Sequence, residues 1–275
     1  MGDGSGGSAI EVRSLRKRFG DEWVLDGVSF SVPLRQTTVL IGPSGAGKTV
    51  TIKHVLGLLE PTQGEVLIGG RDLADMNVGD LRAFRQSLGA VLQGTLPFTC
   101  GLLFSLTLFE NVAEPLRVRQ PRWKDDKITE VTLASLDSVG LLDRAKDLPA
   151  SLSSGMAKRA AIARALALGP ELVIIDDFDS GIDGVRLNLL CTMLRDYQLD
   201  TGATLFLSTH DMGVARALAD HVAVINDGRT VASGTADEVF ASSDPTVQAF
   251  LATESTDFAL PPREPAGTVR LTDQA

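Results

Sequence analysis

The chain has 275 residues, of which 44% are apolar, so it can form one large domain or two lobes with an ample core. Its formal net charge of −9 at pH 7 argues against a general binder of nucleic acid or of anionic membranes, because both need a basic surface. Its two cysteines, Cys100 and Cys191, lie far apart without metal-ligand spacing, which predicts buried reduced thiols of a cytosolic protein.

The two ends of the chain differ in composition from the rest. Residues 1–8 are rich in Gly and Ser and lack the regions of a secretion signal, so we expect a flexible leader. The Pro- and Thr-rich tail over 252–275 is expected to be poorly ordered. No apolar run reaches the roughly 18 residues that a membrane-spanning helix needs, and the nearest candidate, 98–109, is typical of a core helix or loop.

The first third of the chain predicts strands around a single helix. Residues 9–34 alternate in the manner of an antiparallel hairpin, and the β-branched run 37–41 is typical of a buried strand. A helix is expected to begin at Lys48, followed by a strand at 65–68. The charged residues of 71–88 favour a helix.

The rest of the chain predicts helices followed by strands. The pattern over 107–168 is mainly helical, and we expect the helices to break at Pro115, Pro121 and Pro149. The continuous apolar run 172–175 is typical of a central parallel strand.

A helix over 185–200 then leads to a strand at 204–208. Two short strands, 222–225 and 230–232, are predicted to pair through the turn 226–229.

The motif between the strand 37–41 and the following helix is the most specific in the chain. Residues 42–49 fit the phosphate-binding pattern G-x-x-x-x-G-K-[ST] without a mismatch, in the strand-to-helix context that the pattern requires, which leaves little room for a chance Gly-rich turn. Lys48 would reach the β- and γ-phosphates, and the Thr49 hydroxyl would hold Mg²⁺. The residues expected to contact the nucleotide here are Gly42, Pro43, Ser44, Gly45, Ala46, Gly47, Lys48 and Thr49.

A carboxylate supplies the second element of a nucleoside triphosphate site. Asp176 follows directly on the apolar strand 172–175 and is expected to hold Mg²⁺ opposite Thr49. An aspartate at the end of a strand is common, so this interpretation depends on the phosphate-binding motif upstream.

The segment 152–156, Leu-Ser-Ser-Gly-Met, with the helix-prone 158–166 after it, resembles the signature of ATP-binding cassette (ABC) ATPases. The resemblance covers about residues 9–250. It implies an α/β fold of the P-loop NTPase, ABC-ATPase type, with a RecA-like core, an antiparallel β subdomain and a helical subdomain at about 94–168, within one ATP-binding domain over 9–251.

Further motifs follow in the order of that family. Gln93 matches the Q-loop glutamine, Asp183 closes a D-loop-like segment, His210 matches the switch histidine, and Phe19 matches the aromatic residue that stacks on adenine. The resemblance implies that Lys48, Gln93, Asp177 and His210 act in catalysis, and that Gln93 joins Thr49 and Asp176 at Mg²⁺.

The resemblance also implies a dimer. In the family the signature segment faces the ATP of a second subunit, so Ser153, Gly155 and Asp183 are expected to contact a nucleotide across a head-to-tail pair. Translation-factor and DNA-repair members of the family carry a second cassette or a coiled coil, neither of which this sequence shows, so we expect no nucleic-acid partner.

Met156 in place of the usual glutamine, with the segments 108–117 and 179–186, resembles the Mce and Mla type of lipid-transport ATPase. That group implies ATP-driven movement of lipids or sterols through a separate permease, Mce-type substrate-binding partners, and a peripheral position on the cytoplasmic face of the bacterial inner membrane. The apolar run 98–109 lies where the family docks its permease, and it predicts either an enlarged docking surface or extra core packing.

Three residues depart from the family pattern. Asp177 stands where the family has a catalytic glutamate, Phe178 stands at a usual proline, and Ser154 replaces a glycine. Withdrawing a carboxylate by one methylene can cost on the order of 10²-fold in rate. The hypothesis is therefore an ATP binder with slowed hydrolysis; the alternatives are an importer ATPase for another solute and an ATP-gated regulator that barely hydrolyses.

Overall fold

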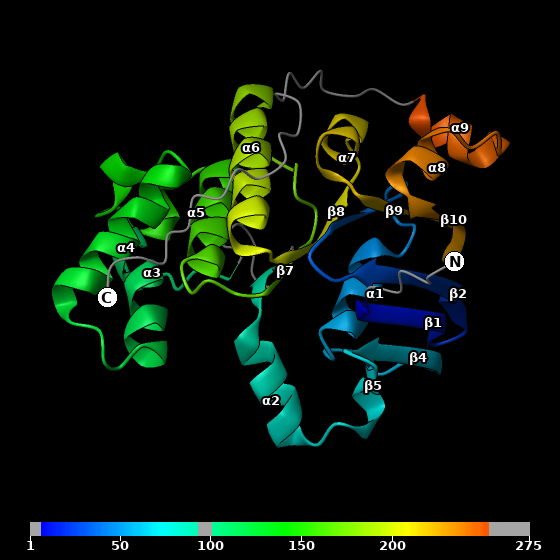
Figure 1. The fold of residues 1–275 in the computed structure, drawn as a ribbon, viewed down its shortest axis with the longest axis horizontal. Coiled ribbons are helices and arrows are strands. Elements are labelled where there is room, and N and C mark those ends of the chain that lie inside the picture. Colours follow the sequence, from blue (N-terminus) through cyan, green and yellow to red (C-terminus); the bar gives the residue numbers. More distant parts are fainter. Residues whose placement is uncertain (1–6, 93–100, 253–275) are drawn as a thin grey trace, which may run out of the picture.

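The computed structural model describes residues 7–92 and 101–252 (Figure 1). A four-stranded antiparallel sheet comes first, in the order β2-β1-β4-β5. Its strands are β1 (Ser8–Phe19), β2 (Glu22–Pro33), β4 (Gln63–Ile68) and β5 (Arg71–Asp72). The long β1–β2 hairpin confirms the pairing predicted for 9–34.

The second sheet has six strands in the order β10-β9-β3-β8-β7-β6, and all neighbours except the β9–β10 hairpin run parallel. All five residues of β3 are buried, which explains why its sequence does not alternate. The strands are β3 (Thr37–Ile41), β6 (Gly89–Val91), β7 (Leu172–Ile175), β8 (Thr204–Thr209), β9 (His221–Asn226) and β10 (Arg229–Thr235).

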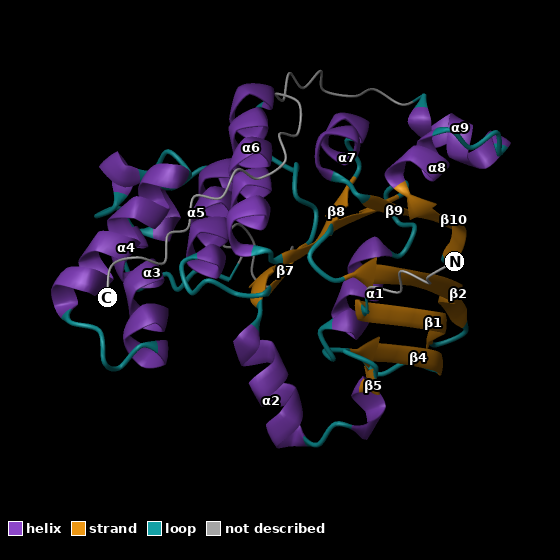
Figure 2. Ribbon diagram, viewed as in Figure 1, coloured by secondary structure: helices purple, strands orange, loops and turns teal. Residues whose placement is uncertain are grey.

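Helices cover both faces of the six-stranded sheet (Figure 2). One face packs on α1 and the antiparallel sheet, where the rings of Phe30 and Phe206 lie 5.5 Å apart. The other face packs on α5 and α6, which form a second core with α3 and α4. A third, smaller core joins α7, α8 and α9 to β3 and β9. The helices are α1 (Lys48–Val55), α2 (Val78–Ser87), α3 (Leu108–Arg119), α4 (Asp125–Ser138), α5 (Ser154–Leu166), α6 (Gly184–Thr201), α7 (Met212–Leu218), α8 (Ala236–Phe240) and α9 (Pro245–Leu251).

The helical region 107–168 corrects one prediction. Pro115 lies inside α3 and does not break it. A capping box between Thr107 and Glu110 fixes the start of α3, and the helix buries Val112 and Leu116 completely, so packing outweighs the local penalty of a proline. The breaks predicted at Pro121 and Pro149 are confirmed: α3 ends just before Pro121, and Pro149 opens a short 3₁₀ turn between α4 and α5.

The boundaries predicted for the domain stay predictions. Ser8, inside the predicted leader, already pairs with Pro33. Residues 1–6 and 253–275, which hold most of the leader and tail, lie outside the described residues, as does part of the helical subdomain.

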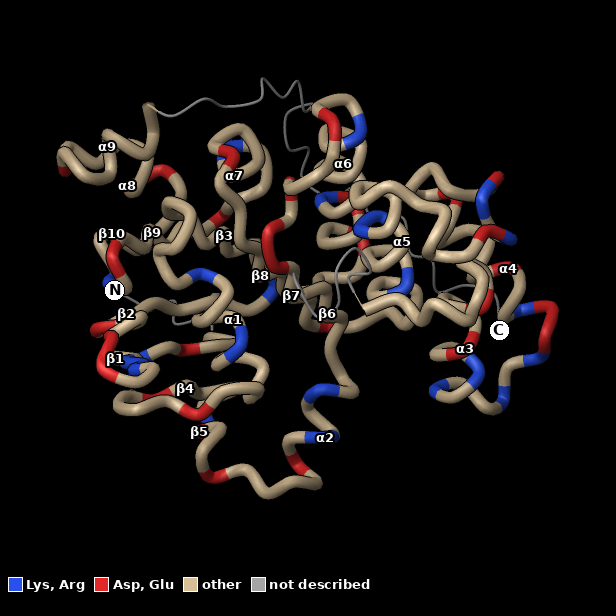
Figure 3. Tube along the Cα trace, turned by 180° about the vertical axis from the view of Figure 1, so that it is seen from behind, with Lys and Arg blue, Asp and Glu red and all other residues tan. Residues whose placement is uncertain are grey.

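Surface charge and helix length bear on the expected partners. Lys and Arg are mixed with Asp and Glu across the molecule (Figure 3). Within 7–92 and 101–252, every helix is too short or too polar to cross a bilayer.

Candidate nucleotide-binding site

A cavity of about 340 Å³ lies at the carboxyl ends of β3, β7 and β8, the edge where parallel sheets bind ligands. The phosphate-binding loop 42–49 supplies one wall, and the segments that follow β7 and β8 supply the other. Its lining includes Ser44, Gly45, Gly47, Lys48 and Thr49 from the loop. Asp176, Asp177, Ser208 and His210 face them.

The loop takes a conformation that its glycines allow. Gly47 has a left-handed backbone with φ of 101°, and a Cβ there would lie 2.4 Å from Leu25 Cδ2. α1 begins at the next residue, so the N–H groups of its first turn have no partner within the helix and are available to an anion at the cavity.

Lys48 spans the loop from the start of α1. Its Nζ donates hydrogen bonds to the carbonyls of Gly42, at 2.6 Å, and Pro43, at 3.0 Å. Burial lowers the pKa of Lys48, while the carboxylates of Asp177, Asp176 and Asp179 act in the opposite direction. The cation therefore stands among anions at the place expected for the phosphates.

Asp176 meets the requirements of a Mg²⁺ ligand. It is 1% exposed, and its Oδ1 accepts a hydrogen bond from Ser208 Oγ at 2.6 Å. Its Oδ2 is buried and has no hydrogen-bond partner among residues 7–92 and 101–252. Because Thr49 lines the same cavity and Mg²⁺ prefers oxygen ligands, these residues fit the ion.

Both backbone polar groups of Asp177 form hydrogen bonds to side chains of other elements. Its N–H donates to Ser208 Oγ at 2.8 Å, and its carbonyl accepts from Lys158 Nζ at 2.5 Å. The residue adopts a left-handed φ of 54°, which is uncommon outside glycine. The N–H that Phe178 gains over a proline donates to the Ser208 carbonyl at 2.8 Å, and the Phe178 ring is fully buried.

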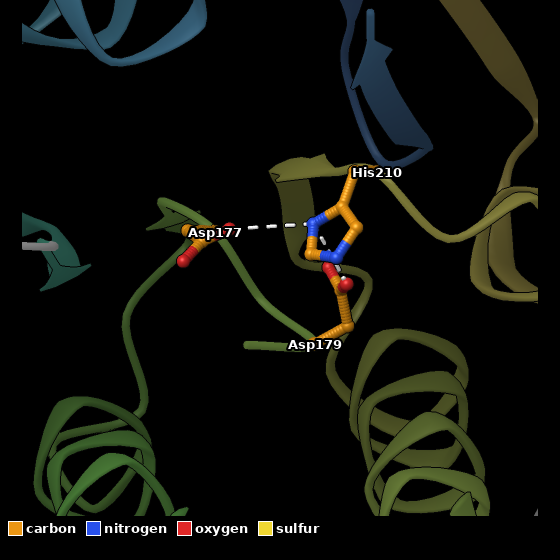
Figure 4. A group of neighbouring side chains, drawn as sticks. All are labelled: Asp177, Asp179 and His210. Carbon is orange, nitrogen blue, oxygen red and sulfur yellow. Dashed lines mark ion pairs between the residues drawn. The ribbon is translucent and has the colours of Figure 1, made fainter. Parts of the chain in front are cut away.

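His210 stands against two carboxylates of the segment that follows β7 (Figure 4). Its Nδ1 lies 3.6 Å from Asp177 Oδ1 and 3.0 Å from Asp179 Oδ2. Asp179 is buried and also accepts a hydrogen bond from Thr209 Oγ1. The imidazole thus joins the ends of β7 and β8 at the edge of the cavity.

Seven predicted nucleotide contacts do not line this cavity: Gly42, Pro43 and Ala46 of the loop, and Phe19, Ser153, Gly155 and Asp183 outside it. Phe19 is 47% exposed, and its ring lies 5.3 Å from Lys17 Nζ. Ser153 and Asp183 cap the N-termini of α5 and α6. Gly155 packs on Gly181, whose carbonyl oxygen would lie 2.2 Å from a Cβ at position 155. Their contacts with nucleotide stay predictions, and those of Ser153, Gly155 and Asp183 require a second subunit.

Two other predictions fall outside the described part of the chain. Gln93, expected at Mg²⁺ and in catalysis, lies outside the described residues, and so does Cys100. Cys191 is fully buried, as expected, and burial raises the pKa of its thiol to about 12.

Three residues of the site escaped the sequence interpretation. Ser208 bonds both Asp176 and Asp177, Asp179 contacts His210, and Lys158 binds the Asp177 carbonyl. All three lie inside segments that the sequence analysis singled out. Asp179 and Ser208 each stand two residues from a predicted catalytic residue, and Lys158 belongs to the signature segment, but none was assigned a role there.

Comparison with known proteins agrees with this geometry. Residues 25–180 match the ABC transporter family. The probable ribonucleotide transport ATP-binding protein Mkl of Mycobacterium leprae is 36% identical over 89% of this chain and 69% of its own length. The intermembrane phospholipid transport ATP-binding protein MlaF of Haemophilus influenzae is 33% identical over 90% and 91%. The methionine import ATP-binding protein MetN of Rhizobium johnstonii is 37% identical over 85% and 62%.

A solved structure shows the same fold. The dimeric ATP-binding cassette MJ0796, in a post-hydrolysis state with ADP and phosphate, superposes with a TM-score of 0.74 at 27% identity, covering 82% of this chain and 98% of that one. The predicted P-loop fold of the ABC-ATPase type is confirmed. The chain belongs to the ABC transporter family, as one of its ATP-binding subunits.

Proposed function

We propose that this chain hydrolyses ATP to drive the transport of a lipid or sterol, as one of a pair of subunits docked on a separate permease at the cytoplasmic face of the bacterial inner membrane. The observation that carries the proposal is the cavity in which Lys48, Asp176 and Asp177 meet beside His210. It gathers a phosphate-binding cation, a metal-binding carboxylate and a candidate base within one small volume.

The residues of the cavity divide the work of hydrolysis. Asp177 takes a proton from the water that attacks the γ-phosphorus, while the bond from that phosphorus to the ADP oxygen breaks. Lys48 and His210 hold the phosphate oxygens. Thr49 and Asp176, with Gln93 as a further predicted ligand, would hold Mg²⁺, which would neutralise charge on the phosphates.

The position of Asp177 supports slowed hydrolysis. Its carboxylate is one methylene shorter than a glutamate, and its two oxygens already lie near nitrogen atoms of two other side chains. Oδ2 is 3.9 Å from Lys158 Nζ, and Oδ1 is 3.6 Å from His210 Nδ1. Both contacts restrain the carboxylate, so the shorter side chain has little freedom to move toward a water in the cavity.

Steady-state ATP turnover of the wild type and of Asp177→Glu tests the proposal. The longer side chain should raise the rate by about 10- to 10²-fold, because misplacement of a reacting group by roughly 1 Å costs that order. Asp177→Asn should lose turnover, and Lys48→Ala should lose ATP binding. A wild type that is already brisk and gains nothing from Asp177→Glu would refute slowed hydrolysis. Failure of all these proteins to turn over ATP would favour the ATP-gated regulator.

The transported molecule is inferred from relatives alone. The name of MlaF gives phospholipid as the cargo of its system, and that protein matches this chain over nearly its full length. Importing another solute remains the second candidate, since MetN is named for methionine. Purifying this chain with its permease from native membranes, and identifying the lipid or solute that comes with it, separates the two.

An apolar surface on a hydrogen-bonded loop supports docking on a permease. Leu103 is 57% exposed and Phe104 is 46% exposed. Asn111 holds the loop that carries them, through its Oδ1 to the Leu103 N–H and through its Nδ2 to the carbonyls of residues 103, 106 and 107. The part of the predicted docking run before Gly101 lies outside the described residues.

A further inference from the structure

Lys158 is a buried cation that belongs to the signature helix α5 and reaches the segment after β7. It is 5% exposed. Its Nζ donates hydrogen bonds to the carbonyls of Asp177, at 2.5 Å, and Ser180, at 2.8 Å. The same nitrogen lies 3.9 Å from Asp177 Oδ2. One ammonium group therefore holds both ends of the segment 177–180.

This segment needs outside support. Asp177 has a left-handed backbone, which a side-chain-bearing residue keeps only when its surroundings hold it. Two hydrogen bonds provide that hold: Ser208 Oγ accepts from the N–H of Asp177, and Lys158 donates to its carbonyl. Ser208 belongs to β8 and Lys158 to α5, so the position of Asp177 depends on the positions of these two elements.

The signature helix is also fixed on its other side and at its start. Arg159, the neighbour of Lys158, donates from Nη1 to the carbonyls of Val139 and Gly140 at the end of α4. Gly155, at the start of α5, packs directly on Gly181. A displacement of residues 153–156 would therefore move Lys158 with them, because these residues and Lys158 belong to one short helix and its cap.

We propose that Lys158 is a positioning residue for Asp177. Through its hydrogen bonds, the position of the signature segment determines the position of the candidate base. The proposal deepens the proposed function, since it takes Asp177 as the base for ATP hydrolysis. Lys158 does not line the nucleotide cavity, so its effect should fall on the chemical step and not on the affinity for ATP.

Two experiments with Lys158→Met test the proposal. In hydrogen exchange of the full chain without nucleotide, the amides of 177–183 should exchange at least about 10-fold faster than in the wild type, while β3 and α1 stay unchanged. In steady-state turnover, kcat should fall by about 10- to 10²-fold at a nearly unchanged KM. Lys158→Arg, which keeps the charge and the donors, should recover part of both.

Matched variants separate positioning from general damage. Lys127→Met makes the same change at an exposed lysine of α4 and should leave exchange and turnover as in the wild type. In an Asp177→Asn background, Lys158→Met should add little further loss of turnover, since both variants disable one unit. An equal loss in both backgrounds, or unchanged exchange over 177–183, overturns the proposal.

The exchange experiment also keeps the proposal separate from the proposed function. It needs no ATP, so a chain that never hydrolyses ATP still shows whether Lys158 holds the segment. If Lys158→Met does not fold, Lys158→Gln, which retains a donor at a shorter reach, replaces it with the same expected order of effects.

Discussion

Ser208 is the residue on which the two aspartates of the site depend most directly, and Ser208→Ala measures that dependence. The side chain is fully buried, donates to Asp176 Oδ1 at 2.6 Å and accepts from the Asp177 N–H at 2.8 Å. A hydrogen bond to a charged group contributes about 1.5–3 kcal/mol and a neutral one about 0.5–1.5 kcal/mol, so the substitution should lower the free energy of unfolding by about 2–4 kcal/mol.

Thermal unfolding monitored by circular dichroism is the assay. A chain of roughly this size loses about 2–4 °C in Tm for each kcal/mol, so we expect a fall of roughly 4–16 °C. Ser87→Ala is the matched control, because the Ser87 hydroxyl makes one exposed hydrogen bond, to the Phe84 carbonyl, within α2. A Tm for Ser208→Ala within about 1 °C of that control would refute the reasoning, since it would mean that neither hydrogen bond stabilises the fold.

Two further predictions address the signature helix and its neighbour α6. Gly155→Ala should reduce ATP turnover and lower the free energy of unfolding by about 1–3 kcal/mol, because its Cβ would lie 2.2 Å from the Gly181 carbonyl oxygen; turnover and Tm equal to the wild type would contradict this. Burial raises the pKa of Tyr197, the only tyrosine of the chain, to about 12, so in an absorbance titration the phenol should stay protonated well above its unfolded pKa of about 10. Because the folded chain keeps the phenol protonated more strongly than the unfolded chain does, the contribution of neutral Tyr197 to the free energy of unfolding is fully present below about pH 10 and is lost as the pH rises toward 12. A phenol that ionises near pH 10 while the chain is still folded would show that Tyr197 is solvated.

The local parts of the site could be predicted from the sequence. The strand, the glycine-rich loop and the helix from Lys48 are adjacent in the chain, so their pattern carries both the fold and the chemistry. Asp176 was identified because it directly follows a buried strand whose apolar run is visible in the sequence, whereas His210 was identified from the resemblance of its segment to the switch histidine of the family.

The contacts between distant segments could not be predicted in the same way. Lys158 reaches a carbonyl 19 residues away, and Ser208 reaches an N–H 31 residues away, in pairings that only the packing of α5 and β8 determines. The break expected at Pro115 was wrong for a related reason. The propensity of one residue gave way to the buried face of a whole helix, which no local rule includes.

The placement of the signature residues agrees with the prediction that they meet the nucleotide of a second subunit. Lys48, Asp176 and His210 line the cavity, whereas Ser153 is exposed at the cap of α5 and outside the lining. The first N–H groups of α5 have no partner within the helix other than the Ser153 side chain, so this end can still meet an anion brought by another molecule. If a second copy brings its γ-phosphate to that end, the contact presses on the same helix that holds Asp177 through Lys158. Closure of the pair would then also position the base, so that hydrolysis would begin only after both nucleotides are enclosed.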